Sequence, residues 1–338
     1  MRPTALAAGG LAAIATLAVM LTLGPRPITL GSEATGDVSV SAALRTHAEP
    51  GHHDLAAFHF DKGEVRFGGL DADEHTEFEI GSIAKTFNAE LLREQIERGD
   101  ITLATTVGEL IDVPGAPIAD VTMEELVNHT SGLSSAPSEL LGNHLPVASI
   151  NANPYRKATA EDIISYAGEA ELHNRGERHY SNYGHALLGQ LLARNANMSY
   201  EELLRAAIIE PAGMTETHLA TSGTGEVSSR GLGLSGRPVE PWDMDGWAPA
   251  GAIRSTPADM AKYVQWVADH GRPEYGWSHR EIGGKEYTFH NGGTGGFRTM
   301  LVWSPDDTAA VFVANNSSVW VDELAVDLLA DFEGTQQR

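Results

Sequence analysis

The sequence predicts an α/β fold of the α+β type, in which both ends of the chain contribute strands to one antiparallel sheet. Two strand patterns near the N-terminus and four near the C-terminus are separated by turn signals such as Asp61-Lys62-Gly63. Between them, residues 111–244 carry helix-capping patterns and apolar residues at helical spacing. We therefore expect an antiparallel sheet formed by the N- and C-terminal segments and flanked by helices, with an all-helical domain inserted between its two halves.

The elements follow from these patterns in chain order. Alternating apolar residues predict strands at 55–60, 64–68 and 77–80, and a glycine break then leads into a helix from about Ser82 to Arg98. Capping motifs predict helices that begin after Thr122, Thr159 and Ser199, and apolar spacing predicts another at 183–194. The C-terminal part is expected to form strands at 275–282, 285–289, 297–303 and 308–314, followed by an amphipathic helix at 319–332.

The N-terminal segment predicts export from the cytoplasm. Ala5 to Leu23 is a run of 19 residues without a charge, which follows Arg2 and ends at Gly24-Pro25-Arg26. Its length lies between a signal-peptide core and a full membrane span, so we expect residues 1–30 to be either a cleaved signal peptide or a membrane anchor. The rest of the chain is then expected to be extracytoplasmic, either secreted or held at the membrane.

The remaining residues are expected to divide into a linker and two domains. Residues 31–53 are polar and glycine-containing and are expected to be a linker, with a helix or short strand at 38–44. Residues 54–110 and 245–338 are expected to form the sheet domain, and residues 111–244 the helical domain.

Composition excludes several classes of function. The chain carries 46 Asp and Glu against 23 Lys and Arg, a net charge of −23, so nucleic-acid binding is not expected. It has no cysteine, which removes disulfides, thiolate chemistry and Cys-ligated zinc. We expect no metal or other cofactor and a small molecule as the partner, while the sequence leaves the oligomeric state open.

Ser82 and Lys85 form the first candidate catalytic pair. Ser82 falls at the first turn of a predicted helix, where free backbone N–H groups and the positive end of the helix dipole gather. Lys85 lies three residues on, on the same helix face. A serine and a lysine so placed can act as nucleophile and base, and the N–H groups can bind an oxyanion. On this stretch alone, the alternative is a serine that only caps the helix.

Two further polar motifs supply what acyl transfer from Ser82 needs. Tyr180-Ser181-Asn182 places a phenol and an amide two residues apart, just before a predicted helix. His290-Asn291-Gly292-Gly293 ends a predicted strand, and its glycines allow a substrate to approach the backbone closely. A second proton carrier and groups that hold a substrate are therefore available.

Together the three motifs resemble those of the serine β-lactamase and penicillin-binding-protein superfamily, in its class C-like branch with esterases and D-alanyl-D-alanine carboxypeptidases. That branch carries Ser-x-x-Lys, then Tyr-x-Asn, then Lys-Thr-Gly or His-x-Gly. The chain has Ser82-Ile83-Ala84-Lys85, Tyr180-Ser181-Asn182 and His290-Asn291-Gly292, each once, at spacings of 98 and 110 residues. Secondary matches occur at 126–133 and 251–260, and the resemblance covers roughly residues 38 to 332. It implies a β-lactamase/transpeptidase-like fold.

The resemblance also implies a role for each motif residue. Ser82 would attack the substrate carbonyl and carry the acyl group, while Lys85 and Tyr180 would together take and return the proton. Asn182 would hold a substrate amide, and the backbone N–H groups of Ser82 and Gly293 would form the oxyanion hole. To act as a base, Lys85 must lose its charge or Tyr180 must gain anionic character, and the sequence leaves open which of them does so.

The third motif departs from that of the β-lactamases themselves, because His290 stands where they carry a lysine. A lysine there is a permanent cation beside the substrate carboxylate, whereas a histidine is mostly neutral at pH 7. Gly292 keeps the glycine of the motif and is expected to line the substrate site. Arg298, just past Gly295-Gly296-Phe297, is a candidate partner for a substrate carboxylate; the alternative is an exposed charge at a strand end.

The expected function is hydrolysis of an ester or amide bond through an acyl-serine intermediate. The expected substrate is a small ester, an amide or a D-amino-acid peptide. The candidates are a carboxylesterase, a serine-type D-Ala-D-Ala carboxypeptidase and a weak β-lactamase. The alternative, prompted by His290, is a penicillin-recognising or scaffold protein of the same fold that does not hydrolyse its ligand.

Overall fold

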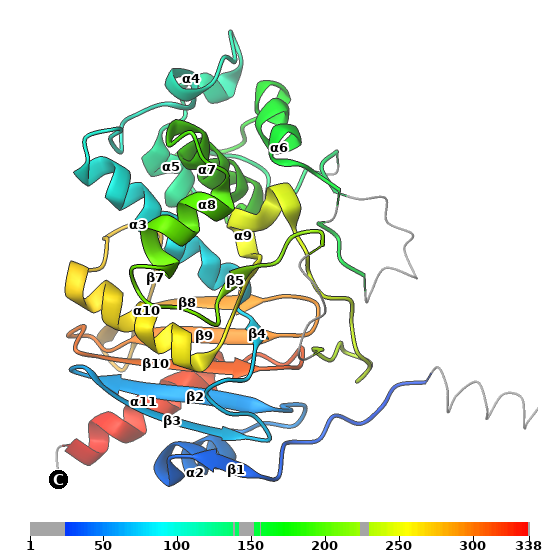
Figure 1. Cartoon of the computed structure of the whole chain (residues 1–338), viewed down its shortest axis with the longest axis vertical. Coiled ribbons are helices and arrows are strands. Elements are labelled where there is room, and N and C mark those ends of the chain that lie inside the picture. The colour runs from blue at the N-terminus through cyan, green and yellow to red at the C-terminus, as the bar shows by residue number, and fades with distance from the viewer. Residues whose placement is uncertain (1–23, 138, 142–151, 156, 224–229, 337–338) are drawn as a thin grey trace, which may run out of the picture.

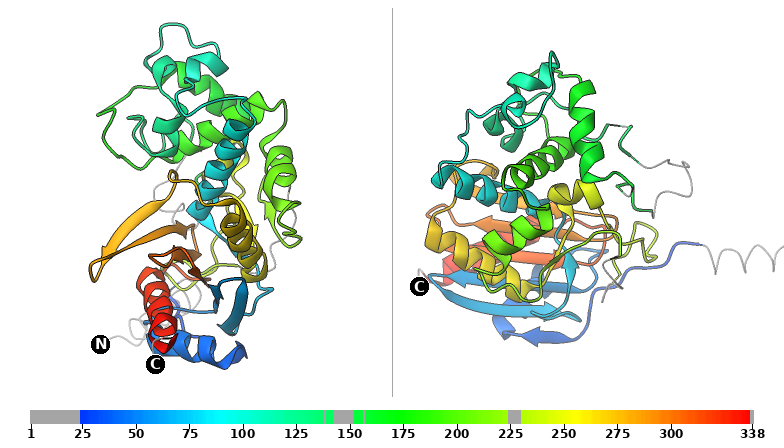
Figure 2. Two further views of the ribbon diagram at one scale, coloured as in Figure 1. Left: turned by 90° about the vertical axis from the view of Figure 1, so that its left-hand side faces the viewer. Right: turned by 45° about the horizontal axis from the view of Figure 1, so that its top comes forward.

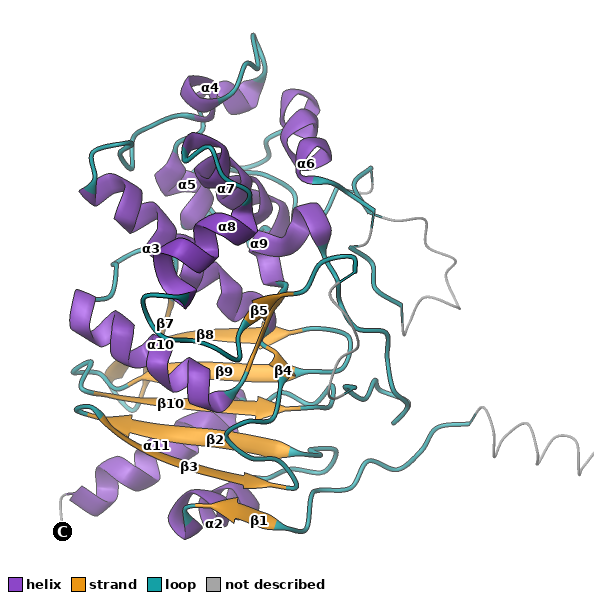
Figure 3. Ribbon diagram, in the orientation of Figure 1, coloured by secondary structure: helices purple, strands orange, loops and turns teal. Residues whose placement is uncertain are grey.

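A seven-stranded antiparallel sheet forms the base of the molecule (Figures 1 and 3). The computed structural model describes residues 24–137, 139–141, 152–155, 157–223 and 230–336. In spatial order the strands are β1 (Ala34–Gly36), β3 (Glu64–Leu70), β2 (Leu55–Asp61), β10 (Ala309–Asn315), β9 (Arg298–Trp303), β8 (Lys285–Gly293) and β7 (Ser278–Ile282). N- and C-terminal strands meet where β2 pairs with β10, with Phe58 opposite Phe312. The prediction of one antiparallel sheet built from both ends is confirmed.

Alternating side chains of the sheet enter two hydrophobic cores, one on each face. In β10, Val311 and Val313 face α2 (Val38–His47) and α11 (Asp322–Gln336), whereas Phe312 faces the opposite core with α10 (Pro257–His270). Figure 2 shows α2 and α11 together on one side of the sheet and α10 on the other. The sheet is therefore buried on both faces, which explains why β10 is apolar at almost every position.

Residues 31–53, which we expected to be a linker, belong to the sheet layer. They contain β1, which pairs with β3, and the helix α2, whose first turn is capped by Asp37. Gly68 lets α2 come close, since a Cβ atom there would lie 2.7 Å from Val40 Cβ. The linker prediction is therefore wrong. The apolar stripe of this segment is short, and its partners lie in a strand about 30 residues further along the chain.

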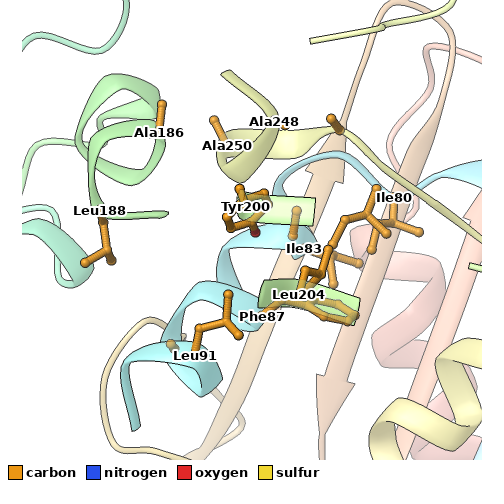
Figure 4. Close-up of a cluster of buried hydrophobic side chains, with 14 of the residues drawn as sticks. Ile80, Ile83, Phe87, Leu91, Ala186, Leu188, Tyr200, Leu204, Ala248 and Ala250 are labelled. Atoms are coloured by element: carbon orange, nitrogen blue, oxygen red, sulfur yellow. The ribbon is translucent and has the colours of Figure 1, made fainter. Parts of the chain in front are cut away.

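The helices between the two halves of the sheet form a layer above it (Figure 2). They are α3 (Ala84–Glu97), α4 (Val107–Leu110), α5 (Met123–Val127), α6 (Ala160–Tyr166), α7 (Asn182–Asn195), α8 (Tyr200–Leu204) and α9 (Ala248–Gly251). Figure 4 shows how Ile83, Phe87 and Leu91 of the segment around α3 pack with residues of α7, α8 and α9. The strand predicted at 77–80 is present as β4 (Phe78–Glu79), which is followed by a short turn and then α3. It lies in a short second sheet with β6 (Ile253–Ser255) and β5 (His218–Leu219), which was not foreseen.

The N-terminal apolar run lies outside the described residues. Within the described part of the chain, no helix is long and apolar enough to cross a membrane. Export and anchoring through residues 1–30 therefore stay a prediction from the sequence.

Candidate active site

Ser82 lies in a short 3₁₀ turn, η1 (Gly81–Ile83), directly before α3. The turn is held from both sides. Ile80 N–H donates to Ile253 O at 3.0 Å, and Ile80 O accepts a hydrogen bond from Thr299 Oγ1 at 2.9 Å. Gly81 has φ of +54°, a conformation that glycine adopts without strain. Ser82 is thereby set at the start of a helix while remaining partly exposed.

The end of β8 is pressed against this turn. A Cβ atom on Gly292 would lie 1.9 Å from Ile80 O, and one on Gly81 would lie 2.6 Å from the backbone nitrogen of Gly293. Both positions therefore need glycine. Gly293 N therefore lies close to the turn that carries Ser82. An oxyanion hole requires two backbone N–H donors near one point, and its formation by Ser82 and Gly293 stays a prediction.

Lys85 is completely buried beneath Ser82. Its Nζ donates to Ser82 Oγ at 3.0 Å and also to the carbonyl of Ala250 in α9. Burial lowers the pKa of Lys85 to about 7, because removal from water disfavours the charged form. A lysine with this pKa can accept a proton near neutral pH.

Tyr180 approaches Ser82 from the other side. Its hydroxyl donates to Ser82 Oγ at 2.6 Å, and Lys85 Nζ lies 5.0 Å from the centre of its ring. Burial raises the pKa of Tyr180, and neighbouring groups only partly oppose this, so the phenol keeps its proton. The structure thus brings Ser82, Lys85 and Tyr180 into direct contact.

His129 positions Tyr180. Its ring lies 4.5 Å from the Tyr180 ring, and its Nδ1 accepts a hydrogen bond from Ser181 N–H at 3.1 Å. Its own carbonyl accepts from His179 N–H, so both sides of Tyr180 are tied to this residue. Ser181 then caps α7 by accepting from Gly184 N–H at 2.8 Å. The bonds to His129 and the cap of α7 together hold the backbone on both sides of Tyr180, whose hydroxyl contacts Ser82.

His290 lies buried in β8 behind the motif glycines. Its Nδ1 is 2.8 Å from the carbonyl of Asn291, so Nδ1 carries the proton of a neutral ring. Burial is the main cause that lowers the pKa of His290 to about 3, and the positive charge of Lys85 lowers it further. The third motif therefore supplies no cation at neutral pH.

Arg298 lies beside Gly293, in the neighbouring strand. Its Nη1 donates to the carbonyls of Thr294 and Phe297, and its guanidinium lies 4.6 Å from the centre of the Trp320 ring. A Cβ atom on Gly293 would lie 3.4 Å from Arg298 Cζ. Arg298 is thus a partly exposed cation that two hydrogen bonds hold in place. It lies next to Gly293, whose N–H is the proposed oxyanion donor.

Asn182, the first residue of α7, is partly exposed next to Tyr180. Its Nδ2 donates to the hydroxyl of Tyr155 at 3.1 Å. Tyr155 was missed by the sequence analysis because it lies in a loop without periodicity and belongs to none of the three motifs. Nothing in the local sequence marks it.

Glu79 was also missed, although it lies only three residues before Ser82. It is buried, and its Oε1 accepts a hydrogen bond from Trp242 N–H at 2.8 Å, with Arg254 Nη2 3.8 Å away. Burial raises the pKa of Glu79. A glutamate in a predicted strand, three residues before the candidate nucleophile, was the signal that could have identified it. It ties the loop that carries Trp242 to the segment that carries the nucleophile.

Chemically, this arrangement can transfer an acyl group. It has a hydroxyl on an exposed turn, a buried amine that can take its proton, and a phenol that can donate one. Within the described residues no cluster of His, Cys, Asp and Glu is suited to hold a metal ion.

The chain is similar to known proteins in sequence and in fold. The model of the Beta-lactamase family matches residues 48–336. The chain is 24% identical over 255 residues to Penicillin-binding protein 4 of Amycolatopsis lactamdurans, a match that covers 68% of this chain and 60% of that protein. It therefore spans less than two thirds of that relative's length.

Two solved structures have the same fold. The Beta-Lactamase/D-Alanine Carboxypeptidase from Pseudomonas syringae superposes with a TM-score of 0.71 at 16% identity, covering 87% of this chain and 98% of that one. The D-amino acid amidase from Ochrobactrum anthropi SV3, complexed with L-phenylalanine, gives a TM-score of 0.74 at 20% identity, covering 88% and 98%. At these identities the two structures establish the fold alone.

Proposed function

The chain belongs to the Beta-lactamase family, and we propose that it hydrolyses an ester or amide bond of a small molecule through an acyl enzyme on Ser82. One observation carries the proposal. Ser82 Oγ lies 3.0 Å from Lys85 Nζ and 2.6 Å from the hydroxyl of Tyr180, so a base and an acid contact the same nucleophile.

In the proposed mechanism Lys85 is the base. Its lowered pKa leaves a large neutral fraction near pH 7, and the neutral amine takes the proton of Ser82 as Oγ attacks the carbonyl carbon. The N–H groups of Ser82 and Gly293 hold the resulting oxyanion. Tyr180 hands a proton to the leaving group and is reprotonated from Lys85, and the acyl enzyme forms as the bond to the leaving group breaks.

Deacylation repeats these steps with water. No separate glutamate for this step was matched in the sequence, so we assign activation of the water to the same Lys85–Tyr180 pair. Water adds to the acyl carbonyl, its proton passes to the pair, and Ser82 Oγ leaves with a proton returned to it. The products are the acid and the free enzyme.

The neutral His290 supports esters and amides over β-lactams as substrates. A permanent cation in the third motif would meet a substrate carboxylate, but the pKa of His290 is about 3. We propose that Arg298 meets such a carboxylate where a substrate has one, because its guanidinium lies next to Gly293. The structural relatives are a D-amino acid amidase and a Beta-Lactamase/D-Alanine Carboxypeptidase, names that agree with small amides as substrates and include a β-lactamase.

Ser82→Ala tests the proposal. We expect hydrolysis of p-nitrophenyl butyrate to fall at least ~10³-fold, since the nucleophile is lost. Mass spectrometry of the native protein with this ester, a D-alanyl-D-alanine peptide and a penicillin should show transient adducts on Ser82 and none in the variant. Ser165→Ala, at an exposed serine of α6, is the matched control and should leave activity unchanged.

Other results separate the alternatives. Full activity in Ser82→Ala would contradict the proposed mechanism. A long-lived penicillin adduct on Ser82, with no turnover of any of the three substrates, would instead identify a penicillin-recognising protein that does not hydrolyse its ligand.

A further inference from the structure

A hairpin at residues 231–239 carries the most exposed large apolar side chain of the described residues. Leu232 pairs with Pro238, and Gly236 N–H donates to Gly233 O at 2.8 Å to close a tight turn. Leu234 occupies the first corner of this turn and is 84% exposed. A single exposed leucine needs no explanation by itself. Its surroundings give it one.

The hairpin is packed firmly against the rest of the molecule. Leu232 N–H donates to Asn316 O at 2.8 Å. A Cβ atom on Gly231 would lie 2.3 Å from Gly296 O, so the two backbones touch. Gly296 belongs to the turn that follows Gly293. The hairpin therefore lies beside the end of β8 that carries the proposed oxyanion donor.

The first described residues, 24–30, lie against this hairpin. Arg26 N–H donates to Ser235 O at 2.7 Å, and Arg237 Nε donates to Gly24 O at 3.0 Å. Two hydrogen bonds thus join the start of the described chain to the turn of the hairpin.

The uncharged run Ala5–Leu23 ends where this contact begins. Three residues lead from Leu23 to Arg26, and a chain spans at most about 3.6 Å per residue, so Arg26 lies within about 11 Å of the end of the run. As a helix, the 19 residues of the run would span about 28 Å, close to the hydrocarbon thickness of a bilayer. A run that anchors the chain in a membrane therefore holds the hairpin at the membrane surface.

Charge distinguishes this surface from the rest of the chain. Residues 24–30 and 230–239 contain Arg26, Arg230 and Arg237 and no Asp or Glu, in a chain with a net charge of −23. Arg26 and Arg230 are exposed. Arginines close to an anionic bilayer are attracted to it, whereas the average charge of the protein is repelled. An apolar side chain beside such cations is typical of a surface that contacts lipid head groups.

We infer that the hairpin and residues 24–30 form a membrane-contact surface, in which Leu234 enters the bilayer interface and Arg26 and Arg230 meet anionic head groups. This contact places the end of β8, with Gly293, close to the membrane. The inference concerns where the protein lies and does not depend on the hydrolase proposal.

A fluorescent probe at position 234 tests the inference in the full chain. The chain has no cysteine, so Leu234→Cys offers one labelling site for the environment-sensitive fluorophore NBD. The labelled protein is reconstituted in vesicles of equal parts phosphatidylcholine and phosphatidylglycerol. We expect lipids with a spin label on the acyl chain to quench the probe, because an interfacial side chain lies about 5–10 Å inside the head-group boundary.

Met198→Cys is the matched control. Met198 is 45% exposed between α7 and α8, and Figure 1 shows these helices apart from the dark blue start of the described chain. The same N-terminal run precedes both labelled positions, so the control reports loose adsorption of the protein to the vesicle. We expect no quenching at position 198. No quenching at 234, equal quenching at both positions, or a protein that does not float with the vesicles overturns the inference.

A second pair of variants tests the arginines in the protein labelled at position 234. Arg26→Gln with Arg230→Gln should reduce the quenching at least about twofold, and so should vesicles of phosphatidylcholine alone. Arg98→Gln with Arg205→Gln makes the same change in net charge at two exposed arginines of the helical layer and should leave the quenching unchanged. Midpoints of thermal unfolding show that each variant is folded. Quenching that depends neither on lipid charge nor on Arg26 and Arg230 overturns the inference, whatever the protein hydrolyses.

Discussion

Burial acts in opposite directions on the two groups that contact Ser82. It lowers the pKa of Lys85 to about 7 and raises that of Tyr180, because in each case the charged form loses its hydration. In the proposed mechanism Lys85 is therefore the base and Tyr180 the acid. Lys85 is fully buried, whereas Tyr180 is 41% exposed, so this assignment depends on the burial of the lysine.

The first prediction at the scale of single residues concerns pH. Since Lys85 acts only when deprotonated, kcat/KM for p-nitrophenyl acetate should rise about tenfold per pH unit below about pH 7 and level off above it. Steady-state rates between about pH 5 and pH 9, corrected for spontaneous hydrolysis, measure this. The histidines near Lys85 do not explain this rising limb of the pH–rate profile, because the pKa values of His129 and His290 are about 2 and about 3.

Variants assign the limb to one group. Tyr180→Phe should lower the rate and keep the limb near pH 7, whereas Lys85→Arg should abolish activity, since an arginine does not deprotonate. Glu90→Gln should also keep the limb near pH 7. This variant is needed because the pKa of the buried Glu90 is raised to about 7 as well, so Glu90 is a second candidate for the limb. Loss of the limb in Tyr180→Phe, with only a pH-independent residual rate, would make the tyrosine the base.

At the scale of elements, the site depends on how closely the end of β8 approaches the turn η1. The contact is backbone against backbone. Gly81 faces the nitrogen of Gly293, and Gly292 faces the carbonyl of Ile80. These two elements are about 200 residues apart in the chain, and the absence of side chains at the contact lets them supply donors to one point.

Gly81→Ala tests this contact. The added Cβ would lie 2.6 Å from Gly293 N, so β8 must shift and the oxyanion donors separate. We expect kcat/KM to fall about 100-fold, the size of effect that displacements near 1 Å produce. The measurement is hydrolysis of p-nitrophenyl acetate together with the midpoint of thermal unfolding.

Gly99→Ala is the matched control. Gly99 has φ of +77°, and a Cβ there would meet nothing within 4 Å, so this variant carries the backbone strain without the clash. Both variants should lose stability, by about 1–2 kcal/mol for the strain, but Gly99→Ala should keep its activity. Equal losses of activity in the two would show that the approach of β8 is not what matters.

At the scale of the whole molecule, a buried ion pair lies between the helices above the sheet. Glu90 of α3 is fully buried, and Arg93 Nη2 lies 2.7 Å from its Oε2. Burial raises the pKa of Glu90 from 4.5 to about 7, although Arg93 opposes the shift. The folded state therefore binds this proton more tightly than the unfolded chain does.

The sign of the effect on stability follows from this difference. The contribution of Glu90 is fully present below about pH 4.5 and is lost as the pH rises to about 7. A shift of this size corresponds to roughly 3 kcal/mol. Glu90→Gln, which resembles the protonated form, should abolish this part of the loss between about pH 5 and pH 8, as measured by urea unfolding.

Glu97→Gln is the control for the Glu90 prediction. Glu97 pairs with the same Arg93 at 3.0 Å but is exposed, so its loss should shift stability by well under ~1 kcal/mol at both pH values. If Glu90→Gln loses as much stability as the native protein over this range, the buried carboxyl is not the cause.

Local patterns were sufficient for much of the fold and for the catalytic motif. The hairpin of β2 and β3, the meander of β7 to β10 and the helix after Ser82 follow from turn residues, alternation and caps, which act over a few residues. The strand at 77–80 was predicted, but its partners β6 and β5 were not foreseen, because strands of two or three residues carry no period of their own.

The sequence by itself determined the family, the sheet built from both ends, and the identity of Ser82, Lys85 and Tyr180 as candidates for one site. The tertiary structure decided that residues 31–53 belong to the sheet and that Lys85 is completely buried beneath Ser82. It also placed the hydroxyl of Tyr155 against the amide of Asn182. The physical reason is the same in each case. Burial, pKa and hydrogen-bond orientation depend on neighbours such as Ala250 and Trp242, which lie far away in the chain and which no local pattern identifies.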